Sequence, residues 1–432
     1  MRLWSQGLAL ALAASVLFTG CGGDDDSSAT VDNEPKKATD NVRSDDTAQP
    51  DTGDGQQQPR GIPTASIPSL DDDDDVNEQA DVNFTRPNEG TPEWFILQII
   101  ELQQSPLPDT DDIEKLSAAR RIRNQKIVEF ATNAIAAAHD DPNKEQVFNV
   151  AVHRLMGATF QLAMQGDQES VDALYGHAES LYKRDPKSRS ARESAWFVSR
   201  FANENARRFA ERDSRWVKEF SQQSRIFAER FPADKRAVVL LNDAALSCEY
   251  YGNTSEAILC YRSLTELFPK SKQAVQAVAP LRRMALPGKK LDLGGPTVDG
   301  AFLTVEDYKG APVLIAFWST QAKPFVDNAP QIIQTVAQHE AKGLQVIGVN
   351  LDTNESAIDS FSEKTGLGWR TLFHADPAKR GWNHPVAVHY GVRSIPQFWF
   401  VNADGTVATT SITTGNLAAS LTKLMANQPQ RK

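Results

Sequence analysis

Residues 313–325 read VLIAFWSTQAKPF, and this stretch decides the fold of the last third of the chain. Its first six residues are all apolar, which is typical of a β-strand that is covered on both faces. The sequence then predicts a helix over residues 323–342. We therefore expect a strand that leads into a helix, which is the first half of a βαβ unit.

The residues on either side continue this α/β pattern. Gly294-Gly295-Pro296 is expected to form a turn between two short early strands. The later elements are expected as strands at 345–350, 397–401 and 406–410, helices at 355–365 and 417–427, and a hairpin turn at 402–405. The order predicts a βαβ crossover followed by a β-hairpin and a terminal helix.

Three segments of this region are similar to a known family. GKKLDLGGPTVDGAFLTVEDYKGAPVLIAFWST occupies residues 288–320, GWNHP occupies 381–385, and YGVRSIPQFWFVNADGT occupies 390–406. With these motifs, residues 288–427 resemble the TlpA-like (ResA-like) thioredoxin-fold proteins of bacterial envelopes. The resemblance implies a thioredoxin-like domain over 288–432, thiol–disulfide exchange as the family's activity, and a cis-proline at Pro396.

The sequence departs from this resemblance where the family has its two reactive cysteines. Members continue F-W-A-T-W-C-x-P-C, whereas residues 317–325 read FWSTQAKPF. Ala322 stands where the resemblance places the attacking thiol and Phe325 where it places the resolving thiol, with Lys323-Pro324 between them. No cysteine follows Cys260, and thiol–disulfide exchange requires a thiolate. We therefore expect no catalytic residue in this domain.

The groove beside the cis-proline is a candidate binding site. In thioredoxin folds the backbone before this proline can pair with an extended peptide, a form of strand addition. We hypothesise a non-catalytic site for an envelope protein or an extended peptide, lined by Trp318, Ala322, Phe325, Ile395 and Pro396. The alternative is that Phe325 folds inward and fills the space that a disulfide would occupy.

Residues 91–285 predict a long helical array, with breaks at proline and glycine. The helix pair 236–251 and 253–268 resembles a tetratricopeptide (TPR) repeat, whose small, aromatic and closing positions correspond to Ala257, Tyr261 and Pro269. The predicted fold class is thus a helical TPR-like array followed by a thioredoxin-like α/β domain. A plain helical bundle that serves as a rigid spacer is the alternative for the array.

Two cysteines, Cys248 and Cys260, lie on this helix pair. In an antiparallel helix pair, the two cysteines would be offset by about one helical turn along the helix axes. This offset would make the Cα–Cα distance too long for an unstrained disulfide. We expect two buried free thiols. A disulfide is the alternative, because an oxidising envelope would permit it.

The N-terminal residues predict export and attachment to a membrane. Residues 1–20 have a basic start and an apolar run of signal-peptide length, and they end at Leu17-Phe18-Thr19-Gly20-Cys21, which resembles the bacterial lipobox. Cys21 is the expected acylation site, and a cleaved signal peptide with an incidental cysteine is the alternative. Residues 21–90 hold 18 acidic and five basic residues and predict a disordered acidic tether.

Composition and motif content exclude several classes of protein. The acidic and basic residues of 91–432 nearly balance, at 38 and 40, and no basic stripe indicates nucleic-acid binding. A mean hydropathy of −0.44 and a single long apolar run exclude a polytopic membrane protein. No phosphate-binding loop or nucleotide fingerprint occurs, and the spacing of His339, His374, His384 and His389 matches no zinc template, so we expect no cofactor and no metal.

These patterns predict a protein of the bacterial cell envelope, exported, lipid-anchored and facing the periplasm. Its thioredoxin-like domain is expected to bind or organise another protein, whose identity the sequence leaves open. One alternative is an oxidoreductase of the TlpA/ResA type that takes its thiols from Cys248 and Cys260 or from a partner. A purely structural spacer is the third possibility.

Overall fold

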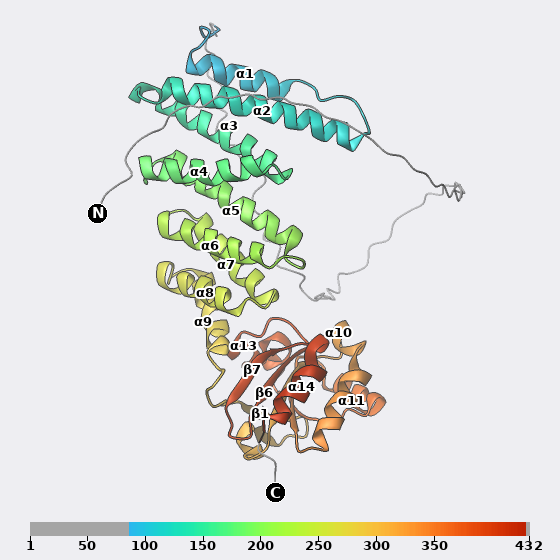
Figure 1. Cartoon of the computed structure of the whole chain (residues 1–432). Coiled ribbons are helices and arrows are strands. Elements are labelled where there is room, and N and C mark those ends of the chain that lie inside the picture. The colour runs from blue at the N-terminus through green and yellow to red at the C-terminus, as the bar shows by residue number, and fades with distance from the viewer. Residues whose placement is uncertain (1–85, 429–432) are drawn as a thin grey trace, which may run out of the picture. The chain divides into compact units, whose positions relative to one another are not determined.

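The computed structural model describes residues 86–428 of the 432-residue chain (Figure 1). The predicted signal peptide, Cys21 and nearly all of the predicted acidic tether lie outside the described residues. Within 86–428, helices α1 to α9 come first and a small sheet with its own helices follows. No helix in this part of the chain combines the length and the hydropathy needed to span a lipid bilayer.

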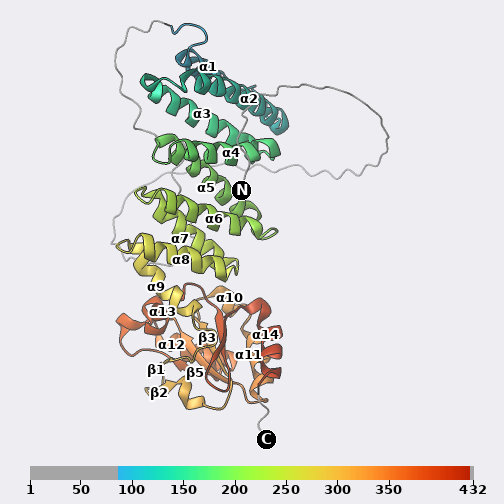
Figure 2. The ribbon, with the colours of Figure 1, turned by 60° about the vertical axis from the view of Figure 1, so that its left-hand side comes forward.

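The first part of the described chain is an array in which each helix packs on the next one (Figures 1 and 2). Its first helix begins as the sequence predicts, because the Thr91 hydroxyl accepts a hydrogen bond from Trp94 N at 3.3 Å and Pro92 occupies the first turn. The helices are α1 (Pro92–Gln104), α2 (Ile113–Ala138), α3 (Glu145–Met164), α4 (Gln168–Arg184), α5 (Arg189–Phe209), α6 (Arg215–Arg230), α7 (Arg236–Tyr250), α8 (Thr254–Leu267) and α9 (Lys272–Met284). The TPR-like character of the array stays a prediction.

Small residues and cross-helix ion pairs hold neighbouring helices together. Ala202 and Ala206 of α5 are fully buried and allow its neighbours to approach closely. The Arg236 guanidinium donates to both oxygens of Glu193, at 2.7 and 2.9 Å, and lies 4.7 Å from the Trp196 ring centroid. The array is thus stabilised mainly by contacts between adjacent helices, as in solenoid proteins.

The second part of the described chain contains a five-stranded mixed sheet with the order β5-β4-β3-β6-β7. β3 is central, parallel to β4 and antiparallel to β6, so the chain follows the predicted crossover and hairpin. The strands are β1 (Gly294–Pro296), β2 (Phe302–Thr304), β3 (Val313–Trp318), β4 (Gln345–Asn350), β5 (Arg370–Leu372), β6 (Gln397–Val401) and β7 (Val407–Ile412). The helices are α10 (Lys323–Val326), α11 (Ala329–Glu340), α12 (Glu355–Thr365), α13 (Pro385–Tyr390) and α14 (Leu417–Ala426).

Strand β3 is buried on both faces, as its apolar run predicts. Val313, Ile315 and Phe317 belong to the core beneath α13, whereas Leu314, Ala316 and Trp318 belong to the core formed with α11, α12 and α14. Every residue of β3 is at most 1% exposed. Because full burial of one such side chain contributes roughly 1.5–3 kcal/mol, this strand is the centre of the domain's stability.

Three details differ from the sequence-based expectation. The helix expected over 323–342 is divided into α10 and α11, because Pro330 has no N–H group and cannot continue the preceding turn. Residues 294–296 form strand β1, which pairs with β2, and no turn. Glycine at position 294 permits this close pairing, because a Cβ there would lie 2.8 Å from Leu303 O of the paired strand. The short strand β5 was not expected, and its three residues carry no clear alternation.

Candidate functional site

The carboxyl ends of β3 and β4 meet at one edge of the sheet, where a buried carboxylate holds the loop after β3. Asp352 is 2% exposed and accepts hydrogen bonds from Ser319 Oγ at 2.6 Å, from Thr320 N at 2.9 Å and from Asn350 Nδ2 at 2.7 Å. Thr320 Oγ1 adds a fourth donor at 3.0 Å. All these donors are neutral, so the carboxylate is compensated for its lost hydration by hydrogen bonds and not by an ion pair. The network fixes the loop that leads to Ala322.

Ala322 and Phe325 lie at the start of α10, and neither carries a nucleophile. Ala322 is the N-cap residue of this short helix and is 9% exposed, and its methyl group cannot accept a hydrogen bond. Phe325 is fully buried, with its ring centroid 5.1 Å from Trp318, 6.0 Å from Phe361 and 6.4 Å from Trp369. The position expected to hold a resolving thiol is therefore occupied by the ring of an aromatic cluster.

The Ile395–Pro396 peptide bond is cis. β3 and β6 pair with Phe317 opposite Gln397, so the next step of this register places Pro396 beside Trp318. Ile395 and Pro396 are half-buried, and Ile395 packs against the cores on both faces of the sheet. The cis-proline loop therefore adjoins the end of β3, at the same edge as Asp352.

These placements correct the expectation of a groove lined by five residues. Trp318 and Phe325 are fully buried and Ala322 is nearly so, whereas Ile395 and Pro396 retain partial access to solvent. The physical reason is the aromatic cluster, because stacking on Trp318 draws the Phe325 ring inward, as in the alternative that the sequence left open.

Cys248 and Cys260 are free and fully buried between α6, α7 and α8. Cys248 Sγ lies 3.7 Å from Val217 O, and Cys260 Sγ lies 3.2 Å from Ser221 Oγ. Burial raises the pKa of Cys260 to about 11 and raises the pKa of Cys248 further. A thiol with a raised pKa and no solvent access is a poor nucleophile at neutral pH.

The histidines serve local structure. His384 is 1% exposed and is the N-cap of α13, where its Nδ1 accepts a hydrogen bond from Val386 N at 3.2 Å. Burial, together with the neighbouring His374, lowers the pKa of His384 to about 4. His339 Nδ1 lies 2.8 Å from Thr335 O. Across residues 86–428, no group of three or more His, Cys, Asp or Glu side chains is placed to hold a metal ion.

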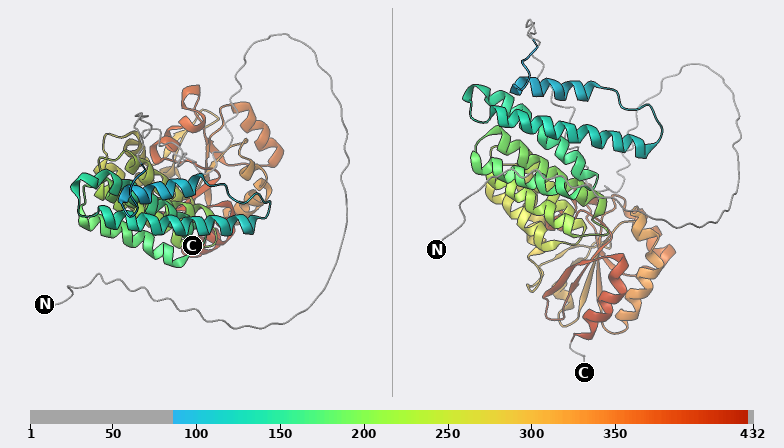
Figure 3. Two further views of the ribbon diagram at one scale, coloured as in Figure 1. Left: turned by 90° about the horizontal axis from the view of Figure 1, so that it is seen from above. Right: turned by 45° about the horizontal axis from the view of Figure 1, so that its top comes forward.

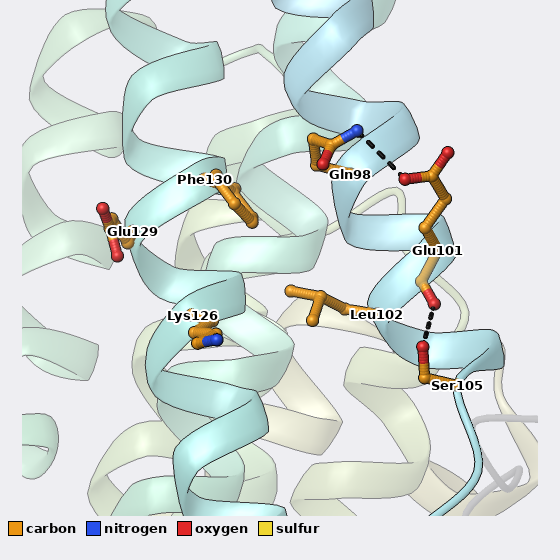
Figure 4. A pocket seen from close by; sticks show the side chains of 7 residues that line it. All are labelled: Gln98, Glu101, Leu102, Ser105, Lys126, Glu129 and Phe130. Carbon is orange, nitrogen blue, oxygen red and sulfur yellow. Dashed lines mark hydrogen bonds between the residues drawn. The ribbon is translucent and has the colours of Figure 1, made fainter.

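The sequence did not predict a surface pocket of about 370 Å³ between α1 and α2 (Figure 4). Within it, Gln98 Nε2 donates to Glu101 Oε2 at 3.1 Å and Ser105 Oγ donates to Glu101 O at 2.8 Å. Its lining residues are Gln98, Glu101, Leu102, Ser105, Lys126, Glu129 and Phe130. Three of the lining residues, Gln98, Glu101 and Ser105, thus bond to one another.

Comparison with known proteins identifies the relatives of the second part of the chain. Residues 287–410 match the model of the AhpC/TSA family. The chain is 24% identical over 123 residues to the thiol-disulfide oxidoreductase ResA of Oceanobacillus iheyensis, a match that covers 28% of this chain and 60% of that relative. ResA of Bacillus anthracis is 24% identical over 110 residues, covering 26% of this chain and 60% of the relative. The chain therefore spans about 60% of the length of these curated relatives.

Solved structures give matches over the same region. The thioredoxin domain of a thiol-disulfide oxidoreductase from Bacteroides vulgatus is 21% identical, with a TM-score of 0.29, over 32% of this chain and 97% of that one. A putative thiol:disulfide interchange protein DsbE from Chlorobium tepidum is 24% identical, with a TM-score of 0.28, over 32% of this chain and 96% of that one. The part of the chain that follows α9 is a C-terminal thioredoxin-fold domain that is similar to the AhpC/TSA family, with thiol–disulfide oxidoreductases among its relatives. The predicted α/β order of this part of the chain, a βαβ crossover followed by a hairpin and a terminal helix, is confirmed.

Proposed function

We propose that this protein is a lipid-anchored protein of the bacterial cell envelope, whose thioredoxin-fold domain binds a protein partner and does not exchange disulfides. One observation carries the proposal: Phe325, at the position that the resemblance gives to a resolving thiol, is fully buried in an aromatic cluster. Ala322 offers no thiolate at the start of α10, and no cysteine follows Cys260. The fold is thus retained while the chemistry of the ResA-type relatives has no nucleophile in this domain.

The burial of the two other cysteines argues against an oxidoreductase that uses internal thiols. Cys248 and Cys260 are both 0% exposed, and burial raises the pKa of each. They belong to the hydrophobic core of α5–α8, so a substrate disulfide could reach them only after that core opened.

The contact surface of the partner is assigned to the cis-proline loop. Ser394 is exposed, and the two residues that follow it, Ile395 and Pro396, are half-buried at the sheet edge. This arrangement suits an extended segment of an envelope protein, whose backbone would pair beside the loop. Acylation at Cys21 and the tether that follows it would keep the domain near the membrane, with the folded part facing the periplasm.

The enzymatic part of the proposal is tested by insulin reduction with the full-length protein. We expect no turnover by the natural chain. The double variant Ala322→Cys, Phe325→Cys should gain a reducible disulfide and some reductase activity, because α10 still presents its N-terminus at residue 322. Turnover by the natural chain that persists in a Cys248→Ala, Cys260→Ala variant would contradict the proposal, and so would turnover that depends on those two thiols.

The binding part of the proposal is tested by crosslinking in living cells. A photoreactive amino acid at Ser394 should give a discrete adduct with an envelope protein. The matched control places the same group at the exposed Glu363 of α12, which lies on another element of the domain. Identical adduct patterns from the two positions, or none from Ser394, would contradict a binding site at the cis-proline loop.

A further inference from the structure

The chain passes from the helical array into the sheet domain through α9, which contacts α13 (Figures 1 and 3). Two arginines of α9 bind free carbonyl groups at the end of α13. Arg282 Nη1 donates to His389 O at 2.6 Å. Arg283 Nη1 donates to Tyr390 O at 3.2 Å and also to Gly391 O. The last carbonyl groups of a helix have no partner within it, and basic side chains are well suited to bind them. The helical array therefore caps a helix of the thioredoxin-fold domain.

A partly buried hydrogen-bond network extends this contact from α9 to α7 and α8. Arg283 is 3% exposed, and its Nη2 group donates to Glu249 Oε1 of α7. The hydroxyl of Tyr261 in α8 donates to Glu249 Oε2 at 2.9 Å, and it accepts a hydrogen bond from Arg393 Nη1 at 3.1 Å. Burial and the negative charge of Glu249 raise the pKa of Tyr261, so its hydroxyl keeps the proton that it donates. Hydrogen bonds to charged groups are among the stronger ones in proteins.

The backbones of the two domains also meet closely at Gly391. This residue has a φ of 61° and follows the last turn of α13. A Cβ at this position would lie 2.6 Å from Pro280 Cδ in α9. Glycine is therefore required here both by its left-handed conformation and by the close approach of the array.

We propose that the helical array positions the cis-proline loop through Arg283 and Arg393. The two points held by the array, Gly391 and Arg393, lie shortly before Ile395-Pro396 in the chain, and only Ser394 separates Arg393 from Ile395. The array is in this view part of the binding unit and not a spacer. The inference rests on the proposed function for the role of the loop, whereas the positioning itself is measurable without any partner.

The test is backbone hydrogen exchange of the full-length protein in detergent, followed by mass spectrometry of the segment 386–396. In Tyr261→Phe the buried ring stays and only the hydroxyl is lost. We expect exchange in this segment to become about five-fold faster, the effect of one hydrogen bond of ordinary strength. The matched control is Tyr175→Phe, which removes a tyrosine–glutamate hydrogen bond of 2.9 Å, to Glu219, inside the array. It should leave exchange in 386–396 unchanged.

A second pair of variants approaches the network from the loop. Arg393 has an exposed side chain, so its replacement should not prevent folding. Arg393→Met should accelerate exchange in 386–396, and Arg393→Lys, which keeps a donor for Tyr261, should restore part of the protection. Unchanged exchange in both Tyr261→Phe and Arg393→Met would overturn the positioning role, even if Ser394 still forms its adduct. Faster exchange without any adduct at Ser394 would support positioning and contradict the proposed function alone.

Discussion

After β3, the N-terminus of α10 carries no cysteine that could act as a nucleophile. The core between α6, α7 and α8, in contrast, contains two cysteines that solvent cannot reach. Ala322 and Phe325 occupy the first place, and the second holds Cys248 and Cys260, both 0% exposed. Thiol–disulfide exchange needs a nucleophile, a lowered pKa and access in one location. The comparison shows that each region lacks what the other has, so neither meets the three conditions.

The largest effect is expected in the reactivity of the array thiols. With the pKa of Cys260 at about 11, about 0.1% of this thiol is ionised at pH 8. Burial adds the cost of opening the core, so alkylation in the Cys21→Ser full-length protein should be at least about 1000-fold slower than after unfolding in guanidinium. Titration with a chromogenic disulfide should detect no fast thiol in the folded state and two after unfolding.

A cysteine introduced at the exposed Glu363 serves as the control for this titration, because it should react at once in the folded protein. Rapid reaction of Cys248 or Cys260 in the folded state would show that solvent reaches the thiols of the array. The array would then have an accessible nucleophile, which the N-terminus of α10 lacks. It would also restore the oxidoreductase alternative.

The second prediction concerns the aromatic cluster. Phe325→Ala removes a fully buried ring that stacks on Trp318, and it should reduce the free energy of unfolding by about 3–5 kcal/mol. Val326→Ala changes the neighbouring side chain, which is 38% exposed, and should cost less than about 1 kcal/mol. Chemical denaturation of both variants gives the comparison. A loss below about 1 kcal/mol for Phe325→Ala would mean that the ring does not support the core.

The sequence predicts the layers of the thioredoxin-fold domain because apolar runs and turn residues report burial directly. VLIAFW at 313–318 predicts a doubly covered strand, and all six residues are buried. The direction of a side chain that follows such an apolar run depends on residues far away in the sequence, so the local sequence does not predict it. Whether Phe325 points inward depends on Trp318, Phe361 and Trp369, which come from three other segments, so the sequence could only state both alternatives.

The contact between α9 and α13 was not predicted, for a similar reason. Arg283 and Gly391 are 108 residues apart, and each has an ordinary local role, as a basic residue in a last helical turn and as a helix-ending glycine. One signal was present: Tyr261 occupies the aromatic position of the TPR-like pattern, but that pattern indicates packing within the array and says nothing of a hydroxyl bonded to Arg393.

The third prediction concerns the pH dependence of stability that His384 produces at the N-terminus of α13. His384 is buried as a neutral ring, and its pKa is lowered from 6.5 to about 4. The unfolded chain binds the proton more readily than the folded chain between these values. The contribution of His384 to stability is therefore fully present above about pH 6.5 and is lost as the pH falls towards 4, to a maximum of about 3 kcal/mol.

This dependence is measured as the difference between the natural chain and His384→Asn, in which the amide oxygen can still cap α13. The variant should lose less stability between pH 6.5 and 4.5 than the natural chain. Parallel curves for the natural chain and His384→Asn would show that His384 is not held neutral by burial.

The smallest effect is expected from the hydrogen bonds to Asp352 in the loop after β3. Ser319→Ala removes the donor that lies 2.6 Å from Asp352 and the acceptor for Gln321 N at 3.1 Å. Three neutral donors remain on the carboxylate, so the loss should be about 1–2 kcal/mol and the fold should persist. Ser411→Ala removes the hydroxyl of an exposed residue, which lies 3.0 Å from Thr409 Oγ1, and it should change stability by less than about 0.5 kcal/mol.

Chemical denaturation again measures the two serine variants, and hydrogen exchange of residues 319–323 locates the effect. Faster exchange of Thr320 and Gln321 in Ser319→Ala, with no change at β7, would show that Asp352 holds the loop. Equal losses for the two variants would contradict that role. The loop at the end of β3 would then be held in place by the aromatic cluster around Phe325 alone. The contrast with the buried cysteines of the array would in that case depend on Phe325 and not on Asp352.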